Sequence, residues 1–131
     1  MSIEVSTEIK SNYLLAICRG LFDNNELFSH YNKIMDIAEN NNLKAVLIDI
    51  QQIEGDLPSF IERFTHGVEV AKMQWKHDSI ILIAIVGKEP FIDPERFGEN
   101  VALNRGARGK VFTDTGEAVA WIDAEIMNST N

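Results

Sequence analysis

The stretch Ala45-Val46-Leu47-Ile48-Asp49-Ile50 decides the fold class of this chain. It is an apolar run interrupted only by an acidic residue near its end, and a segment with Gly55 and Pro58 follows it. A strand that is apolar on both faces has to be covered by helices above and below, which indicates a mainly parallel sheet. In open α/β sheets, ligands and partners bind where the strands deliver their carboxyl ends. The segment 51–58 is therefore the first place to look for function.

Composition and charge narrow the class of protein. The 131 residues fit one domain, and 20 acidic against 12 basic residues give a net charge of -8, which disfavours binding to phosphate backbones and anionic lipids. The single cysteine, Cys18, allows no intramolecular disulfide, so we expect it to be a small core residue in a cytoplasmic protein. No run approaches the ~20 apolar residues that span a bilayer. We expect neither a nucleic-acid partner nor a membrane span.

Upstream of this strand, the sequence predicts a hairpin and a helix. Residues 3–9 alternate between apolar and polar side chains, and a second apolar run at 13–18 follows the turn residues Ser11 and Asn12. Two strands joined this closely predict an antiparallel hairpin. Asp23 or Asn24 then caps a helix that ends at three consecutive asparagines. The apolar residues of this helix recur at helical spacing and are Leu27, Tyr31, Ile34, Met35 and Ala38.

Downstream, helices and strands alternate to the end of the chain. A second helix follows Pro58 and ends near 72–74, with apolar positions Phe60, Ile61, Phe64, Val68 and Ala71. The remaining elements are an apolar strand at 80–86, a third helix from its cap Asp93 to about Asn104, a short strand at 110–113 and a closing helix at 115–126. We therefore expect an α/β fold, a sequential βα array of five strands and four helices around a mixed, mostly parallel sheet. It forms one domain over residues 1–126, followed by a frayed polar tail at 127–131.

Element order and two segments resemble the SpoIIAA-like proteins, which are related to the STAS domains of anti-sigma factor antagonists and sulfate transporters. The segments are Val46–Ile50 and Gly109–Ile122 (GKVFTDTGEAVAWI), and the similarity extends over roughly residues 13–122. The resemblance implies a non-catalytic regulatory or protein-interaction module without a cofactor. In the antagonist branch, the strand that resembles Val46–Ile50 is followed by an Asp-Ser-Ser/Thr-Gly turn, and a partner kinase phosphorylates its hydroxyl.

The corresponding loop departs from that pattern here. It reads Gln51-Gln52-Ile53-Glu54-Gly55-Asp56-Leu57-Pro58-Ser59, and Ser59 carries its only hydroxyl. A phosphate on Ser59 would lie close to a helix N-terminus, which favours anions. Against this, Glu54, Asp56 and Glu62 already crowd the region with negative charge. Ser59 is therefore either a phosphorylation switch or simply the residue that starts the helix.

The polar loop and nearby aromatic side chains form the candidate interaction rim. Its members are Asp49, Gln51, Glu54, Asp56, Ser59, Trp75 and Phe91. Such a rim fits a protein partner with a basic surface, or self-association into a homodimer. The alternative is a binder of a small apolar or anionic ligand, or an enzyme, at the same rim. In that case Asp49, Glu54, Asp56 or His66 would supply the polar groups.

Three further features bear on possible sites or on packing, and the first and the last of them allow two interpretations each. Arg105, Arg108 and Lys110, interleaved with Gly106 and Gly109, either cradle an anion or complement the end of a helix that Gly106 terminates in the left-handed conformation. The histidines His30, His66 and His77 fall on different elements, so the sequence predicts no metal site. Gly67, inside the second helix, indicates close packing against the sheet or against a second subunit.

Overall fold

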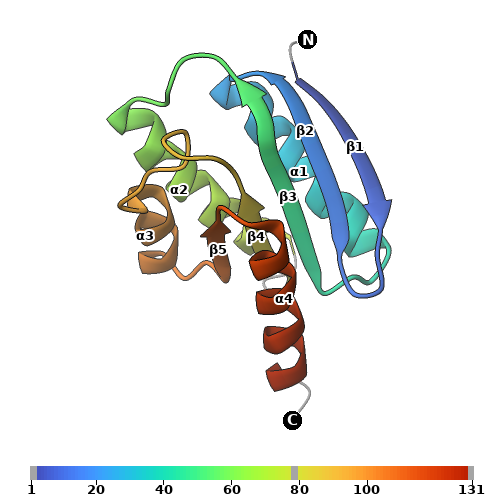
Figure 1. Ribbon diagram of the computed structural model, residues 1–131. Helices are drawn as coiled ribbons and strands as arrows, with labels where there is room; N and C mark the ends of the chain where they lie inside the picture. Colours follow the sequence, from blue (N-terminus) through green and yellow to red (C-terminus); the bar gives the residue numbers. More distant parts are fainter. Residues whose placement is uncertain (1–2, 78–79, 130–131) are drawn as a thin grey trace.

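The computed structural model describes residues 3–77 and 80–129. Within them, one sheet contains five strands in the order β1-β2-β3-β4-β5, so every strand pairs with its neighbours in the sequence (Figure 1). β1 and β2 form an antiparallel hairpin, and the other neighbouring pairs are parallel. The strands are β1 Ile3–Ile9, β2 Leu14–Leu21, β3 Ala45–Glu54, β4 Leu82–Val86 and β5 Gly109–Phe112. The predicted mixed, mostly parallel α/β sheet is confirmed.

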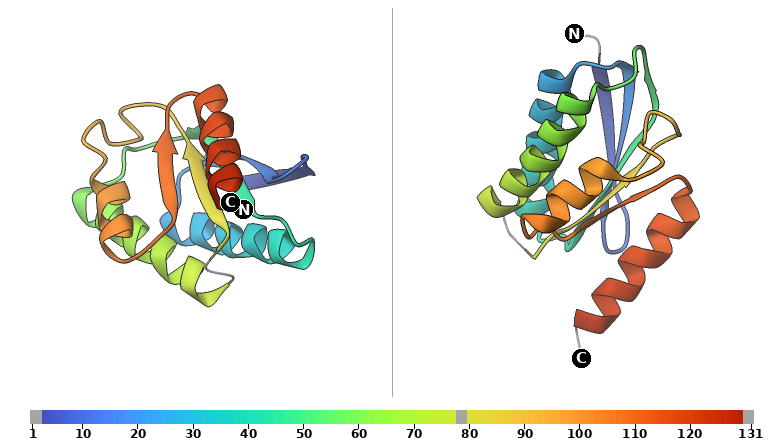
Figure 2. Two further views of the ribbon diagram at one scale, coloured as in Figure 1. Left: turned by 90° about the horizontal axis from the view of Figure 1, so that it is seen from below. Right: turned by 90° about the vertical axis from the view of Figure 1, so that its left-hand side faces the viewer.

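Four helices cover the two faces of this sheet in the described residues. They are α1 Asn24–Asn40, α2 Phe60–Lys76, α3 Phe97–Asn104 and α4 Thr115–Ser129. Seen along the sheet, α1, α2 and α3 lie on one side and α4 lies alone on the other (Figure 2). None of the helices in the described part of the chain is long and apolar enough to cross a membrane.

The helices on both sides explain why β3 and β4 are apolar throughout. Val46 and Ile48 of β3 face the core formed with α1 and α2, whereas Ala45 and Leu47 face the smaller core under α4. Successive strand residues point to opposite faces, so each β3 position is buried against one layer or the other. Cys18 is fully buried in the larger core, as predicted.

The central strand is longer than its apolar run. β3 continues through Gln51 and Gln52 to Glu54, because β2 extends alongside it and pairs Arg19 with Gln52 and Leu21 with Glu54. A register shift in β2 between Ile17 and Arg19 precedes this extension. The predicted strand end at Ile50 is therefore wrong: backbone pairing satisfies these polar residues, and only 55–58 are irregular before the cap of α2.

Several other predicted boundaries shift. α3 begins at Phe97, not at Asp93, because Asp93 stabilises a separate turn: its Oδ1 accepts from the Glu95 N–H at 3.1 Å and its Oδ2 from the Phe97 N–H at 3.0 Å. Arg96, in the left-handed conformation with φ 57°, lies between this turn and the helix. α2 extends to Lys76, β4 begins at Leu82, and α4 continues through 127–129. The rest of the predicted tail, 130–131, lies outside the described residues.

Two glycines have the roles that their positions require. Gly106 follows the end of α3 with φ 86°, which confirms the left-handed helix terminus. Gly67 faces α3, and a methyl group at Gly67 would overlap the backbone carbonyl of Gly98. The close packing at Gly67 is thus between two helices of the same chain, rather than against the sheet.

Candidate functional site

A cavity of about 70 Å³ lies at the carboxyl ends of β3, β4 and β5, on the face covered by α1, α2 and α3. Its apolar wall is formed by Leu27 of α1, the strand residues Ile50, Ile85 and Val111, and Ile92 of the loop after β4. This position follows from the topology, because parallel strands deliver their carboxyl ends to one edge and the helix starts meet there.

Arg63 of α2 ties the loop after β4 to the start of α2. Its Nε donates to the Pro58 carbonyl at 3.3 Å, and its Nη2 donates to the Pro90 carbonyl at 3.0 Å. Its Nη1 also lies 3.8 Å from Oδ1 of Asp93. The hydrogen bond from the Glu95 N–H is the main cause that lowers the pKa of Asp93, with Arg63 among the smaller ones. This carboxylate is therefore held in its ionised form inside the loop.

His66 and Tyr31 form a neutral pair beside the cavity. The Tyr31 hydroxyl lies 3.1 Å from Nε2 of His66, and the ring of Phe28 lies 5.6 Å from the imidazole. Burial lowers the pKa of His66 to about 4 and raises the pKa of Tyr31, so both side chains are uncharged at pH 7. Nε2 is the only partner that the described residues offer to the Tyr31 hydroxyl. The phenol donates to Nε2 when the ring proton of His66 is on Nδ1, and it accepts from Nε2 in the other tautomer, so the contact forms in both.

Asn24, the first residue of α1, carries an unsatisfied buried group at the same cavity. Its side chain lines the cavity, and no group in the described part of the chain donates to its buried carbonyl oxygen Oδ1. Most buried polar atoms in proteins have a hydrogen-bond partner, so an exception calls for an explanation. Sequence reasoning missed Asn24 because it could be read only as a helix cap; the structure assigns the cap to Asp23.

An exposed apolar patch, which we call the α2 patch, lies next to the cavity. It consists of Leu57, Phe60, Ile61 and Phe64. Phe60 stacks on Phe97 at the start of α3, with ring centroids 4.7 Å apart. The apolar positions Phe60, Ile61 and Phe64 predicted the helix correctly, but they do not belong to its buried face. The buried residues of α2 lie further along the helix and are Gly67, Val70, Ala71, Met73 and Gln74.

Comparisons with known proteins show which fold this architecture resembles. Neither a family model nor a curated protein sequence matches the chain. An anti-sigma factor antagonist from Mycobacterium paratuberculosis is similar in structure, with a TM-score of 0.64 and 13% sequence identity over 93% of this chain and 95% of that one. The chain has a SpoIIAA-like fold. An uncharacterized protein of the DUF3478 family with a SpoIIAA-like fold, from Shewanella loihica PV-4, is also similar, with a TM-score of 0.53 and 21% identity over 92% of this chain and 93% of that one.

In this SpoIIAA-like fold, the predicted rim residues do not form one surface. Asp49 and Gln51 lie towards α4: Asp49 Oδ1 accepts from the Gln51 N–H at 2.9 Å, and Gln51 Nε2 lies 3.3 Å from Oγ1 of Thr115. Glu54 and Asp56 are exposed around the loop 55–58. Phe91 lines the cavity instead, with its ring edge-on to Phe22 at 5.1 Å.

Ser59 starts α2 as its N-cap within a capping box. Its Oγ accepts from the Glu62 N–H at 3.1 Å, and Oε1 of Glu62 accepts from the Ser59 N–H at 2.8 Å. The hydroxyl of Ser59 therefore has a structural role as the cap of α2.

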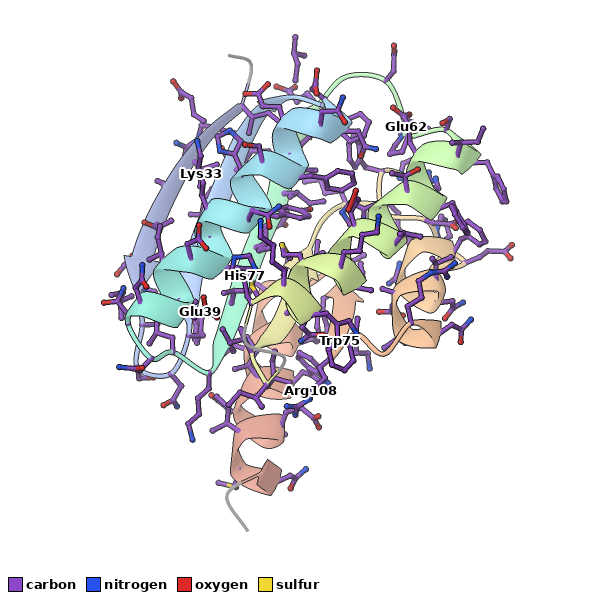
Figure 3. The ribbon with its side chains drawn as sticks, turned by 180° about the vertical axis from the view of Figure 1, so that it is seen from behind. Lys33, Glu39, Glu62, Trp75, His77 and Arg108 are labelled. Atoms are coloured by element: carbon purple, nitrogen blue, oxygen red, sulfur yellow. The ribbon has the colours of Figure 1, made fainter. Side chains whose placement is uncertain are left out.

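Trp75 is far from the rim with which it was grouped. Figure 3 shows Glu62 and Trp75 at opposite ends of α2. The indole Nε1 of Trp75 donates to the Arg105 carbonyl at 3.3 Å, beside Gly106. The expectation that Trp75 lies near the loop 51–58 is wrong, because α2 runs on to Lys76 and carries Trp75 in its last turn.

The three basic residues of the predicted anion site have separate partners. The Arg105 guanidinium lies 5.3 Å from the centre of the Phe64 ring, and Lys110 lies 5.7 Å from the centre of the Phe112 ring. Arg108 Nη1 donates to the Ile80 carbonyl at 3.2 Å. The described structure does not bring these cations together around one ligand.

Of the other two histidines, one lies within α1 and the other follows the end of α2. His30 Nε2 is 3.6 Å from Glu26 within α1. His77, just after α2, lies between two acceptors: Nδ1 is 2.9 Å from the Met73 carbonyl, and Nε2 is 2.7 Å from Oδ1 of Asp36. Glu39 of α1 also lies close to His77 (Figure 3). One ligand atom from each of Asp36, Glu39 and His77 lies within 4.8 Å of the other two. Sequence spacing could not show this group, because it forms only when α1 and α2 pack together.

Proposed function

We propose that this chain is a non-catalytic regulatory module of the cytoplasm that binds a protein partner through the α2 patch. The exposure of this patch carries the proposal: Phe60 is 69% exposed and Ile61 is 72% exposed, although both are large apolar side chains. Contiguous exposed apolar side chains mark protein interaction sites. The fold supports the same class of function, because one structural neighbour is an anti-sigma factor antagonist.

Charge around the patch defines the partner. Three carboxylates lie at its Leu57 end, since Glu54 and Asp56 precede the patch and are exposed and Glu62 lies within it; Arg105, over the Phe64 ring, is a cation at its other end. We expect an apolar ridge on the partner, bordered by lysine or arginine side chains, because like charges across an interface are unfavourable. The same reasoning disfavours a symmetric dimer through this face, which would bring two sets of these carboxylates together.

Site-specific photo-crosslinking tests the proposal in the native cell. A photoreactive amino acid at Ile61 is expected to capture one protein that the same group at Ile9 does not capture. Ile9 is a matched control, since it is 54% exposed on β1, a different element of the fold. The crosslinked peptide of the partner should contain apolar residues flanked by basic ones.

Binding of the purified partner decides the proposal. Ile61→Asp should weaken binding at least about tenfold, because a carboxylate would be buried at the interface centre, whereas Ile9→Asp should not. The proposal would be overturned if crosslinkers at Ile61 and Ile9 captured the same proteins. It would also be overturned if Ile61→Asp bound the partner as tightly as wild type. A dimer in solution that Ile61→Asp dissociates would instead make a second copy of this chain the occupant.

A further inference from the structure

We propose that the cavity at the carboxyl ends of β3, β4 and β5 binds a small, neutral, mainly apolar molecule that carries one hydroxyl or amide group. The cavity measures about 70 Å³, well above the roughly 10–15 Å³ that one water needs. This site is separate from the α2 patch and does not depend on the partner proposed above.

The residues that line the cavity favour a ligand that is mainly apolar. Ile50, Ile85 and Ile92 contribute aliphatic side chains from two strands and the following loop, and all three are buried. Leu27 and Phe91 add to this wall from α1 and from the same loop. An apolar group placed here leaves water and gains contacts with carbon atoms.

Two polar atoms of residues that line the cavity have no hydrogen-bond partner in the described part of the chain. Oδ1 of Asn24 is a buried acceptor to which nothing in the described residues donates. Nδ1 of His66 has no hydrogen-bond partner among those residues, because Tyr31 engages only Nε2. A hydroxyl or a primary amide both donates and accepts, so such a group can donate to Oδ1 of Asn24 and can also bond to Nδ1 of His66 in either tautomer.

The charged residues around the cavity do not call for a charged ligand. Glu62 is held in the capping box with Ser59, and Oε2 of Glu99 accepts from the Val111 N–H at 2.6 Å. Asp93 and Arg63 serve the loop contacts described above, and Nη1 of Arg96, the other cation at the cavity, donates to the Asp93 carbonyl at 3.1 Å. Because these groups already have partners within the protein, an anionic ligand would meet carboxylates without a free cation to compensate, and the neutral alternative is favoured.

Phenol and toluene test the proposal, since they have nearly the same size and differ in the hydroxyl. We expect phenol to shift the amide NMR signals of cavity residues saturably and to bind about tenfold more tightly than toluene, as one satisfied hydrogen bond predicts. Signals of the distant Trp75 should not move.

Variants identify the groups that recognise the hydroxyl. Asn24→Leu removes the acceptor at similar size, so phenol should lose most of its advantage over toluene. Asn25→Leu is the matched control, because Asn25 is the exposed neighbour in the same turn of α1 and should leave the preference unchanged. His66→Phe provides a second, independent variant in case Asn24→Leu disturbs the start of α1, and it should reduce the preference in the same direction.

Three results would overturn the proposal. They are the absence of saturable shifts with either probe, equal affinity for phenol and toluene in the wild type, and a phenol preference that survives in both Asn24→Leu and His66→Phe. The first result would assign the cavity to ordered water, which can also donate to Asn24. The titrations need only the purified chain, so their failure would leave the partner-binding proposal untouched.

Discussion

The hydroxyl of Tyr31 lies 3.1 Å from Nε2 of His66, and this pair links α1 to α2 beside the cavity. His66 is uncharged there, because burial lowers its pKa to about 4 from the ordinary value of 6.5. The unfolded chain takes up a proton at this residue below pH 6.5, whereas the native state does so only near pH 4. Protonation therefore favours the unfolded state throughout this interval.

The first prediction is a loss of stability on acidification. Between pH 6.5 and pH 4, the free energy of unfolding should fall by about 3 kcal/mol through His66, with no further contribution from this residue above pH 6.5. Urea unfolding of wild type and His66→Phe across this range checks it, since the variant should lack this part of the pH dependence. Ser29→Ala, an exposed position of α1 without a titratable group, is the control and should keep the wild-type profile. Parallel profiles for wild type and His66→Phe would contradict the assignment.

The second prediction concerns the contact between Gly67 and Gly98. In the interior of an exposed helix, Gly→Ala stabilises by up to about 1 kcal/mol. At Gly67 the sign should reverse, because the added methyl would overlap the Gly98 carbonyl and lie 2.8 Å from Cβ of Val101. We expect Gly67→Ala to lower the free energy of unfolding by roughly 1–3 kcal/mol.

Chemical denaturation measures this effect. Ser29→Ala, on the exposed side of α1, should change stability by less than about 0.5 kcal/mol. A Gly67→Ala protein as stable as wild type would show that α2 and α3 can separate at little cost.

The central strands and α2 show which parts of the structure the sequence could predict. The two-faced apolar pattern of Ala45–Ile50 and of the strand before Gly87 is local, so it predicted helices on both sides of a parallel sheet correctly. The apolar residues of α2 predicted the helix but not its buried face, because apolar periodicity does not distinguish a core from an exposed patch. Phe60 packs beside Phe97 at the start of α3, and the sequence does not reveal where that helix start lies.

The cavity was beyond sequence reasoning for a related reason. Asn24, His66 and Ile85 are far apart in the chain and meet only where α1, α2 and β4 come together. Their residue types follow no spacing rule, and each has an ordinary structural interpretation by itself. The expected rim was placed at the right edge of the sheet, but its members diverge because Asp49 and Gln51 point towards α4 while Phe91 lines the cavity on the other face.

The third prediction concerns Gln74, a fully buried polar side chain at the end of α2. Its Nε2 donates to the Ile81 carbonyl, and its Oε1 accepts from the Arg108 N–H, so one amide joins α2 to the residues that precede β4 and β5. Gln74→Leu keeps a similar size but leaves both backbone groups buried without a partner. We expect a loss of roughly 2–4 kcal/mol in the free energy of unfolding.

Amide hydrogen exchange shows where in the structure Gln74→Leu lowers stability. The Arg108 amide should exchange faster in Gln74→Leu than in wild type, beyond the change expected from global stability. Gln52→Leu is the control, because Gln52 is exposed on β3 and its bond to Arg19, at 3.5 Å, is long. Unchanged protection of the Arg108 amide would mean that water replaces the Gln74 side chain.

The fourth prediction separates the structural role of Ser59 from a regulatory one. Ser59→Ala removes the cap of α2 and should cost about 1 kcal/mol, whereas Ser59→Asp should stay within about 0.5 kcal/mol of wild type, because aspartate also caps helices. Ser6→Ala, on the exposed strand β1, controls for loss of a hydroxyl alone. Thermal and urea unfolding measure these differences.

Partner binding then completes the test of Ser59. Because Ser59→Asp keeps the helix cap and adds a charge beside the α2 patch, any change in its affinity for the captured partner reports on that charge rather than on the fold. Weaker binding by Ser59→Asp than by both wild type and Ser59→Ala would indicate that phosphorylation of Ser59 releases the partner. Equal binding by all three proteins would leave Ser59 with the capping role alone, and the α2 patch would then act without a switch at this residue.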